Sequence, residues 1–468
     1  MNACIVADEV ITRFGDTRNG SNPLWAYGSR CIVRHAGCVY AIVPEISREL
    51  KPLCNTRWTL WRRPDGGSWE QTCAAPVFDE REPCLLARLP NGELLISTNP
   101  ARSVNYTNPD GSTAWFCEPQ LVFLDPRHPH QPLRTIAPEW GKRHAFTEHS
   151  YRALAVDTQS GHIFLAQQAL CSDSYELAWV LMDTEGHELH EGKLLYPMRA
   201  CYHQVAAQGG AVSIMGLSDE IDPNQEWHEF KEELTGPGWD FDMRQIYFTH
   251  TPDLLRQSFA PIATVASRDA TAGRTTNLDM HVDPVGVAHL LVIERNVWMY
   301  ALRDRFFPGL PLTVALQYVR VRDSRVISRQ TLSEVVEDMG APRPILPPKG
   351  ASCWDHYRVD PIWLGGKPKP IWATFHTDAE QGLHVLYTLQ SGNDEQLLIR
   401  QVHPTASAPQ RLVTEQPLGC FNAPSLRNGC APGNTIDLYG YTGGINKPFC
   451  DEDVIRYVQI RLDPSGKP

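Results

Sequence analysis

The stretch EPCLLARLPNGELLIS, residues Glu82 to Ser97, decides the fold that we expect. Two aliphatic runs flank the pair Asn91-Gly92, and an Asn-Gly turn supplies the positive φ angles that a tight β-hairpin requires. The same unit of run, turn and run recurs at Ser29 to Val43, Ser150 to Gln167, Cys201 to Leu217, Asn277 to Ile293, Trp354 to Phe375 and Asn422 to Tyr441. Seven hairpins of one kind predict a β-propeller.

Second pairs of strand-like runs lie between these hairpins, for example TRWTLWRRPDGGSWEQ (56–71) and VALQYVRVRDSRVISRQTL (314–332). Two hairpins make a four-stranded blade, and division of the chain by seven leaves about 67 residues for each blade. The chain ends in a third run without a fourth, VIRYVQIRLDP (454–464), while CIVADEVIT (4–12) precedes the first unit. We therefore predict an all-β fold: a single domain over residues 1–468 that is a seven-bladed β-propeller, closed by the N-terminal strand completing the last blade. An open β-sandwich or a solenoid is the alternative.

Composition narrows the possible partners. The 43 basic and 54 acidic residues give a net charge of −11, so we expect no nucleic-acid partner. No apolar run approaches the roughly 20 residues that span a bilayer, so we expect no membrane partner. The opening MNACIVADEVITRFGD lacks a basic start and a long apolar stretch, so we expect no signal peptide and a cytoplasmic protein. The odd count of 13 cysteines favours reduced thiols. We predict no cofactor and no metal site. The mixture of charges does not indicate which oligomeric state the protein has.

One face of such a disc should carry the functional site. Because strand direction alternates within a blade, the start of each first strand and the loop from second to third strand share that face. The longest insertions fall in those loops, at 101–118, 218–245 and 294–313, and they include Trp227 and Trp298. Aromatic rings stack on the apolar faces of sugars, so these loops favour a carbohydrate ligand. The alternative is that the aromatics only anchor their own loops.

The segments that lead into the first strands are polar, although they lie near the predicted axis. Several such segments together favour a shared site, because unpaired polar groups are costly to bury unless the protein uses them. The candidates for substrate contact there are Arg30, Arg81, Glu82, Asn277, Asp279, His281, Asp355, His356 and Tyr357, and the candidates for chemistry are His149, Tyr151, Arg199, Tyr202 and His203.

Two segments carry a resemblance to a known family. These are EHSYRALAVDTQSGHIFLA (148–166) and YPMRACYHQVAAQGGAVSIMGLSD (196–219). They resemble the BNR-repeat, sialidase-like β-propellers, particularly the branch that includes ulvan lyases and related enzymes that cleave rhamnose and glucuronate polymers. Asp65, Gly67 and Trp69 also look like a shortened Asp-box turn of the sialidases.

The resemblance implies cleavage of a uronic-acid-containing saccharide by β-elimination. This reaction needs a cation on the carboxylate, a base for the C5 proton and an acid for the leaving oxygen. Carried over by position, Arg199 would neutralise the carboxylate, His149 and His203 would be bases or donors, and Tyr151 or Tyr202 would be the partner acid or base. We also expect nearby cations to lower the pKa of these tyrosines from about 10.

Two other functions stay open. An exo-glycoside hydrolase, sialidase-like or rhamnosidase-like, would need two facing carboxylates, for which Glu82, Glu148, Asp279 and Asp355 are available. A non-catalytic carbohydrate-binding propeller would use the same polar residues only to fill its channel.

Overall fold

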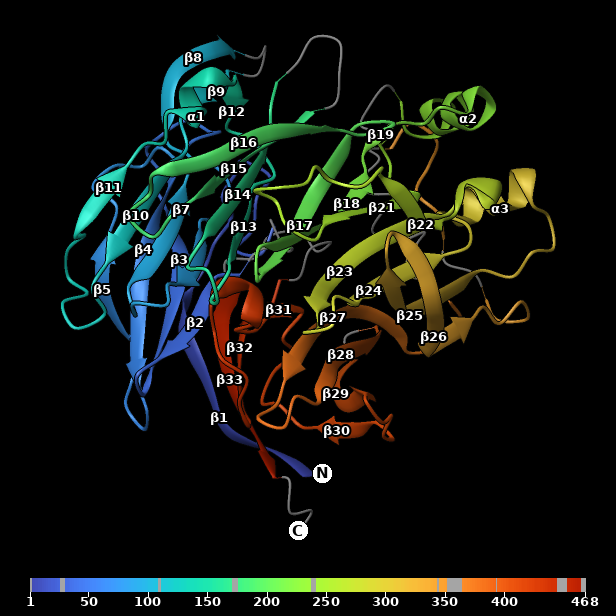
Figure 1. Ribbon diagram of the computed structural model, residues 1–468. Helices are drawn as coiled ribbons and strands as arrows, with labels where there is room; N and C mark the ends of the chain where they lie inside the picture. Colours follow the sequence, from blue (N-terminus) through green and yellow to red (C-terminus); the bar gives the residue numbers. More distant parts are fainter. Residues whose placement is uncertain are drawn as a thin grey trace.

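The computed structural model describes residues 2–25, 30–107, 111–170, 176–236, 241–342, 345–351, 364–392, 394–443 and 453–463 (Figure 1). Within them the fold is all-β, and seven antiparallel sheets have four strands each. Sheet 1 consists of β2 (Ile32–His35), β3 (Cys38–Ile46), β4 (Thr56–Pro64) and β5 (Glu70–Ala74). Sheet 2 consists of β6 (Leu85–Arg88), β7 (Leu94–Thr98), β10 (Gln120–Leu124) and β11 (Arg134–Ile136).

The next four sheets repeat this pattern. Sheet 3 contains β13 (Ala153–Val156), β14 (Ile163–Gln168), β15 (Glu176–Met182) and β16 (Glu188–Leu195). Sheet 4 contains β17 (Ala200–Gln208), β18 (Ala211–Ser218), β21 (Gln245–Thr251) and β22 (Ala263–Ser267). Sheet 5 contains β23 (Arg274–Val282), β24 (Ala288–Arg295), β25 (Thr313–Arg322) and β26 (Arg325–Val336). Sheet 6 contains β27 (Lys369–Thr377), β28 (Leu383–Ser391), β29 (Asp394–His403) and β30 (Gln410–Leu412).

The two ends of the chain meet in sheet 7. It contains β31 (Cys420–Asn422), β32 (Thr435–Tyr441), β33 (Val454–Asp463) and, as its outermost strand, β1 (Asn2–Arg13). β1 runs antiparallel to β33 from Asn2 opposite Asp463 to Arg13 opposite Val454. A strand from the start of the chain thereby covers the edge of the last sheet, which would otherwise expose unpaired backbone groups.

Neighbouring sheets contact one another through their first strands. β2 contacts β6, β6 contacts β13, β13 contacts β17, and the series continues through β23, β27 and β31, while β2 also contacts β32 of sheet 7. Figure 1 shows these strands around the middle of the molecule and the outer strands at its periphery. The first strand β13 is apolar and buried throughout, whereas the outer strand β26 is mostly exposed.

The insertions expected between second and third strands are present in sheets 2, 4 and 5. The first forms β8 (Ala101–Thr107) and β9 (Thr113–Cys117), which β12 (Phe146–Thr147), from the segment between sheets 2 and 3, joins as a third strand. The second contains the pair β19 (Glu220–Ile221) and β20 (Phe241–Asp242) and helix α2 (Gln225–Thr235), and the third contains helix α3 (Tyr300–Phe306). The other short elements are α1 (Trp140–Arg143), η1 (Asp269–Thr271) and η2 (Leu426–Asn428).

The expectation for the sixth hairpin is wrong. The first strand of sheet 6 is Lys369–Thr377, and it pairs with Leu383–Ser391. Its turn is the segment Asp378 to Gly382, in which an Asp378 carboxylate oxygen accepts the backbone N–H groups of Glu380 (3.0 Å) and Gly382 (2.6 Å). The expected hairpin, Trp354 to Phe375, ends inside this first strand. Residues 355–357 therefore do not begin its first strand, and they lie outside the described residues.

Two further features bear on the sequence analysis. In the described part of the chain, no helix combines the length and the apolar character that crossing a membrane requires. The described cysteines are free thiols, and all of them except Cys4 are buried.

A buried carboxylate joins four sheets at the centre. A β-bulge between Asn277 and Asp279 interrupts β23, and the Asp279 side chain is fully buried. Its oxygens lie 2.5 Å from the guanidinium groups of both Arg30 and Arg427, which belong to the segments leading into sheet 1 and to η2 of sheet 7. They also accept the Thr374 hydroxyl (2.8 Å) and the Phe375 N–H (2.7 Å) of sheet 6. Although burial opposes its ionisation, the two arginines hold the pKa of Asp279 below its ordinary value.

We expect Asp279→Asn to destabilise the protein by about 3–5 kcal/mol, because it removes the negative charge that two buried guanidinium groups contact. Urea unfolding at pH 7 measures the loss. Asp323→Asn is the control, since Asp323 is 83% exposed and a change there should stay within about 0.5 kcal/mol. A loss as small as that of the control would show that the Asp279 charge does not hold the sheets together.

Candidate functional site

Two tyrosines at the starts of neighbouring first strands form the base of the site. Tyr151 precedes β13 and Tyr202 lies near the start of β17, in an irregular stretch of the β17–β18 pairing. Both have left-handed backbone conformations, with φ of 48° and 49°, which are strained for bulky residues and are typical of functional sites. Their rings lie edge to face with centroids 4.8 Å apart. The strain therefore brings two phenol rings from different sheets into contact.

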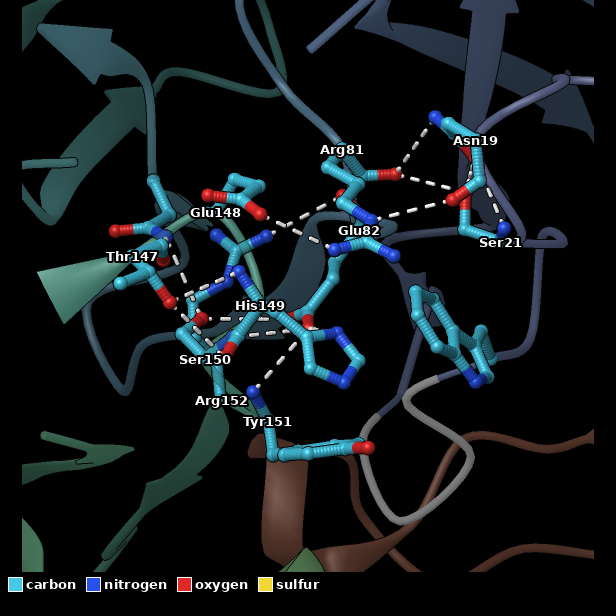
Figure 2. Close-up of polar contacts among 12 residues, drawn as sticks. Asn19, Ser21, Arg81, Glu82, Thr147, Glu148, His149, Ser150, Tyr151 and Arg152 are labelled. Atoms are coloured by element: carbon cyan, nitrogen blue, oxygen red, sulfur yellow. Dashed lines mark hydrogen bonds and ion pairs between the residues drawn. The ribbon is translucent and has the colours of Figure 1, made fainter. Parts of the chain in front are cut away.

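His149 lies beside Tyr151 (Figure 2). Its ring centroid is 4.4 Å from that of Tyr151 and 4.9 Å from that of Trp25. Nδ1 of His149 is 3.4 Å from Oε1 of Glu82, which places a carboxylate beside the imidazole. The side chain of His149 is 24% exposed, whereas Glu82 is 3% exposed. A ligand above the cluster can thus reach the imidazole but not the carboxylate.

Glu82 holds the backbone that presents these rings. Oε1 of Glu82 accepts the N–H groups of Ser150 (2.9 Å) and Tyr151 (3.3 Å), and Oε2 accepts the Ser150 hydroxyl (3.2 Å). Burial opposes the charged form, but hydrogen bonding and the charge of His149, together with the charge of Arg152, lower the pKa of Glu82. The carboxylate is therefore ionised and fully engaged in positioning.

Arg199 supplies the positive charge of the site. Its Nη1 is 2.7 Å from Oδ2 of Asp219, and its guanidinium carbon is 5.9 Å from the centroid of the Tyr151 ring. The Arg199 side chain is 23% exposed, while the Asp219 side chain is completely buried. Asp219 thus anchors the guanidinium from below and leaves part of it open to a ligand.

A second arginine supports the other side of the site. Nη1 of Arg81 is 3.2 Å from Oε1 of Glu148, and its Nε donates to the backbone oxygen of Asn19 (3.2 Å), as Figure 2 shows. The guanidinium carbon of Arg81 lies 5.2 Å from the centroid of the Trp25 ring. Arg81 thereby ties the segment before β2 to the segment before β13.

Burial sets the protonation states in the cluster. Desolvation, together with the charges of Arg81 and Arg199, lowers the pKa of His149, so the imidazole is neutral at pH 7. Desolvation raises the pKa of Tyr151 and of Tyr202 above the usual value. The expectation that nearby cations would lower the tyrosine pKa is therefore wrong, because loss of hydration outweighs the charges. The site combines a neutral base with two protonated phenols.

Other predicted residues lie around this cluster without joining it. Nδ2 of Asn277 donates to the backbone oxygen of Tyr202 (2.8 Å) from a fully buried position. Arg30 and Asp279 belong to the buried ion pairs of the centre. His203 is 2% exposed, and burial lowers its pKa to about 3. The structure does not bring His281 to the cluster: it lies at the other end of β23, beside the turn to β24.

The environment of His281 shows this separation. Its ring neighbours are His289 (5.7 Å) and Phe375 (6.4 Å), and burial lowers its pKa to about 3. Neither neighbour belongs to the segments that carry the tyrosine cluster. Asp355, His356 and Tyr357 lie outside the described residues.

The two predicted tryptophans lie on the insertions of sheets 4 and 5. Trp227, near the start of α2, packs against Phe306 and Phe307 at centroid distances of 6.5 and 6.0 Å. Trp298 precedes α3 and lines a hollow together with Arg274. Trp227 therefore anchors its own loop, and Trp298 borders a concave surface.

Sequence reasoning missed two members of the cluster, Trp25 and Asp219. Nε1 of Trp25 donates to the Tyr202 hydroxyl (3.0 Å) across 177 residues of chain. Trp25 lies in a loop ahead of the first hairpin, where no periodicity marks it. Asp219 ends the quoted segment 196–219, and its position directly after β18, on the face of the insertions, was the available signal.

Comparison with known proteins shows which structures have a similar fold, but it does not show the activity. The sequence matches no protein-family model and no curated protein sequence. The crystal structure of polysaccharide lyase Uly1 is similar, with a TM-score of 0.54 at 10% identity over 99% of each chain. A PL25 ulvan lyase bound to -[GlcA(1-4)Rha3S]- has a TM-score of 0.52 at 10% identity, over 96% of this chain and 95% of the lyase. Neither structure is described as a BNR-repeat protein or a sialidase.

We expect the electrostatics of the cluster to appear in the pKa of His149, followed by NMR of its Cε1–H signal. Arg199→Gln removes a nearby positive charge and should raise this pKa, whereas Glu82→Gln removes a negative charge and should lower it. Arg305→Gln, an exposed change on α3, is the control and should leave it unchanged. An unaltered titration in Arg199→Gln would contradict the geometry described above.

Proposed function

We propose that the seven sheets are the blades of a closed β-propeller and that the chain is a lyase. Its substrate would be a uronic-acid-containing saccharide of the ulvan type, built of rhamnose and glucuronate. The observation that carries this proposal is the juxtaposition of a neutral imidazole, two protonated phenols and a partly open guanidinium. The fold likeness to polysaccharide lyases supports it, since one of them was solved with a glucuronate-rhamnose saccharide bound.

In this mechanism Arg199 binds the substrate carboxylate and stabilises the charge that develops there as the C5 proton leaves. His149 accepts the C5 proton, with Nδ1 directed at Glu82. The C5–H electron pair forms the C4–C5 double bond, and the bond from C4 to the glycosidic oxygen breaks. Tyr202, which at 7% is more exposed than Tyr151 at 2%, gives its proton to the leaving oxygen. The products are an unsaturated uronate and a saccharide with a new hydroxyl.

The hydrolase alternative gains no support from the described carboxylates. Glu82, Glu148 and Asp279 are 4%, 6% and 0% exposed, and each one binds an arginine or backbone N–H groups. A glycosidase needs two carboxylates that face each other across the substrate. The cluster instead presents an imidazole and phenols, which are the groups that proton abstraction requires.

We expect uronate oligosaccharides to yield a product that absorbs near 230 nm, the signature of the unsaturated uronate. His149→Ala and Arg199→Ala should each reduce the rate on the order of 100-fold with the fold intact. Arg305→Gln serves as the control and should keep the rate. Released saccharide without this absorbance would indicate a hydrolase, and binding without turnover would indicate a non-catalytic propeller.

The pH dependence follows from the same shifts. Because the lowered pKa of His149 defines the base, kcat/KM should rise with pH through a value below 6.5 and then stay level. The raised tyrosine pKa values keep the acid protonated to about pH 10 or above. A rate that falls between pH 7 and 9 would contradict these protonation states.

A further inference from the structure

A second arginine, Arg274, stands beside the proposed active site. It is the first residue of β23, and its guanidinium carbon lies 3.9 Å from the centroid of the Trp298 ring. The backbone N–H of Trp298 donates to the oxygen of Ala272 (2.9 Å), which fixes the ring. Arg274 and Trp298 line a hollow whose other charged residues are Asp222, Lys231 and Arg244. The Asp222 carboxylate lies 2.7 Å from both Lys231 and Arg244. A guanidinium stacked in this way keeps its N–H edges available for in-plane hydrogen bonds.

Positive charges concentrate around this stack. Arg295 is the partner of Arg274 in the β23–β24 ladder, and its guanidinium carbon is 5.5 Å from the same Trp298 ring. Burial and the charge of Arg274 lower the pKa of Arg295 to about 10. Burial and the charge of Arg295 lower the pKa of Lys369, the first residue of β27, to about 6. Lys369 is therefore largely neutral at pH 7, whereas Arg295 keeps its charge beside Arg274. Repulsion between these two arginines favours a bound anion.

Comparison with a similar stack shows what distinguishes Arg274. Arg244 lies over the Trp227 ring at 4.9 Å, but its Nη2 is 2.7 Å from Oδ1 of Asp222, which neutralises it. Among the described residues, no carboxylate lies within 4 Å of the Arg274 guanidinium nitrogens. Compared with Arg244, Arg274 therefore retains its capacity for an external anion.

The position of Arg274 relates it to the catalytic cluster. It precedes Asn277 by three residues in β23, a separation of about 10 Å along a strand. Asn277 donates to the backbone of Tyr202, and the Arg274 charge acts on Tyr202 and on Asp219. Arg274 thus lies on the same side of the molecule as Arg199, displaced from it toward the insertions of sheets 4 and 5.

We infer that Arg274, stacked on Trp298, binds a second anionic group of the substrate. This group is a carboxylate or a sulfate ester on a sugar unit next to the one whose carboxylate Arg199 binds. The inference rests on the proposed function for the identity of the ligand. A carboxylate and a sulfate ester both present two oxygens that match the paired N–H groups of an arginine, so Arg274 would select for polyanionic saccharides over neutral ones.

The test is calorimetric binding of three probes to the wild type and to Arg274→Gln. The probes are a tetrasaccharide of glucuronate and 3-sulfated rhamnose, its desulfated form and its carboxyl-reduced form. For the first probe we expect Kd to rise on the order of 10-fold in Arg274→Gln. For each probe the Kd of Arg274→Gln is divided by the Kd of the wild type. This ratio should fall to about one for the modified probe that lacks the group that Arg274 binds. Arg305→Gln, exposed and 5.9 Å from the Phe306 ring, is the matched control and should bind as the wild type does.

The outcomes separate this inference from the proposed function. Arg274→Lys keeps the charge but not the planar fork, so it should bind more weakly than the wild type and more tightly than Arg274→Gln. Three results would each overturn the subsite. Wild type and Arg274→Gln could bind with equal affinity, the Kd ratio could be equal for all three probes, or the wild type could fail to bind. Binding that depends on Arg274 without any absorbance near 230 nm would overturn the lyase and keep the subsite.

Discussion

The carboxylate of Asp279 is the contact on which the arrangement of the sheets depends. A β-bulge in β23 directs this side chain toward Arg30 and Arg427, and the same oxygens accept groups from β27. Burying one carboxylate and two guanidinium groups is costly unless the geometry satisfies them, so four sheets are held at one mutual position. The position of the tyrosine cluster depends on this arrangement, because Asn277, two residues before Asp279, donates a hydrogen bond to the backbone of Tyr202.

Burial lowers the pKa of the imidazole and raises the pKa of the two phenols in the proposed site, and in both cases it favours the neutral form. It removes water from His149 and thereby favours the neutral imidazole, and it removes water from Tyr151 and Tyr202 and thereby favours the neutral phenols. A base that is free to accept a proton and an acid that retains one are both needed for β-elimination at neutral pH. Arg199 keeps its charge because the Asp219 carboxylate lies 2.7 Å from its guanidinium group.

The charge pattern extends beyond this cluster. Each of the arginines Arg81, Arg199 and Arg244 is paired with a buried or half-buried carboxylate. Arg274 differs, since it stacks on the Trp298 ring beside a second arginine, Arg295. The net charge of the chain is −11, so an anionic ligand would depend on local positive charges such as those of Arg199 and Arg274.

The sequence by itself determined the strand pattern, because hairpins repeat with turn residues that local backbone conformation demands, as at Asn91-Gly92. It also indicated His149, Tyr151, Arg199 and Tyr202, since these polar residues precede or begin apolar strands. Only the tertiary structure decided which polar groups are accessible. In the structure the sixth hairpin begins after Gly366, and Asp279 is buried in the interior. Trp25 contacts Tyr202, which is 177 residues away in the sequence. Local patterns report what a residue's neighbours in the chain are, whereas burial and the pKa values that follow from it depend on residues that only the packed sheets bring together.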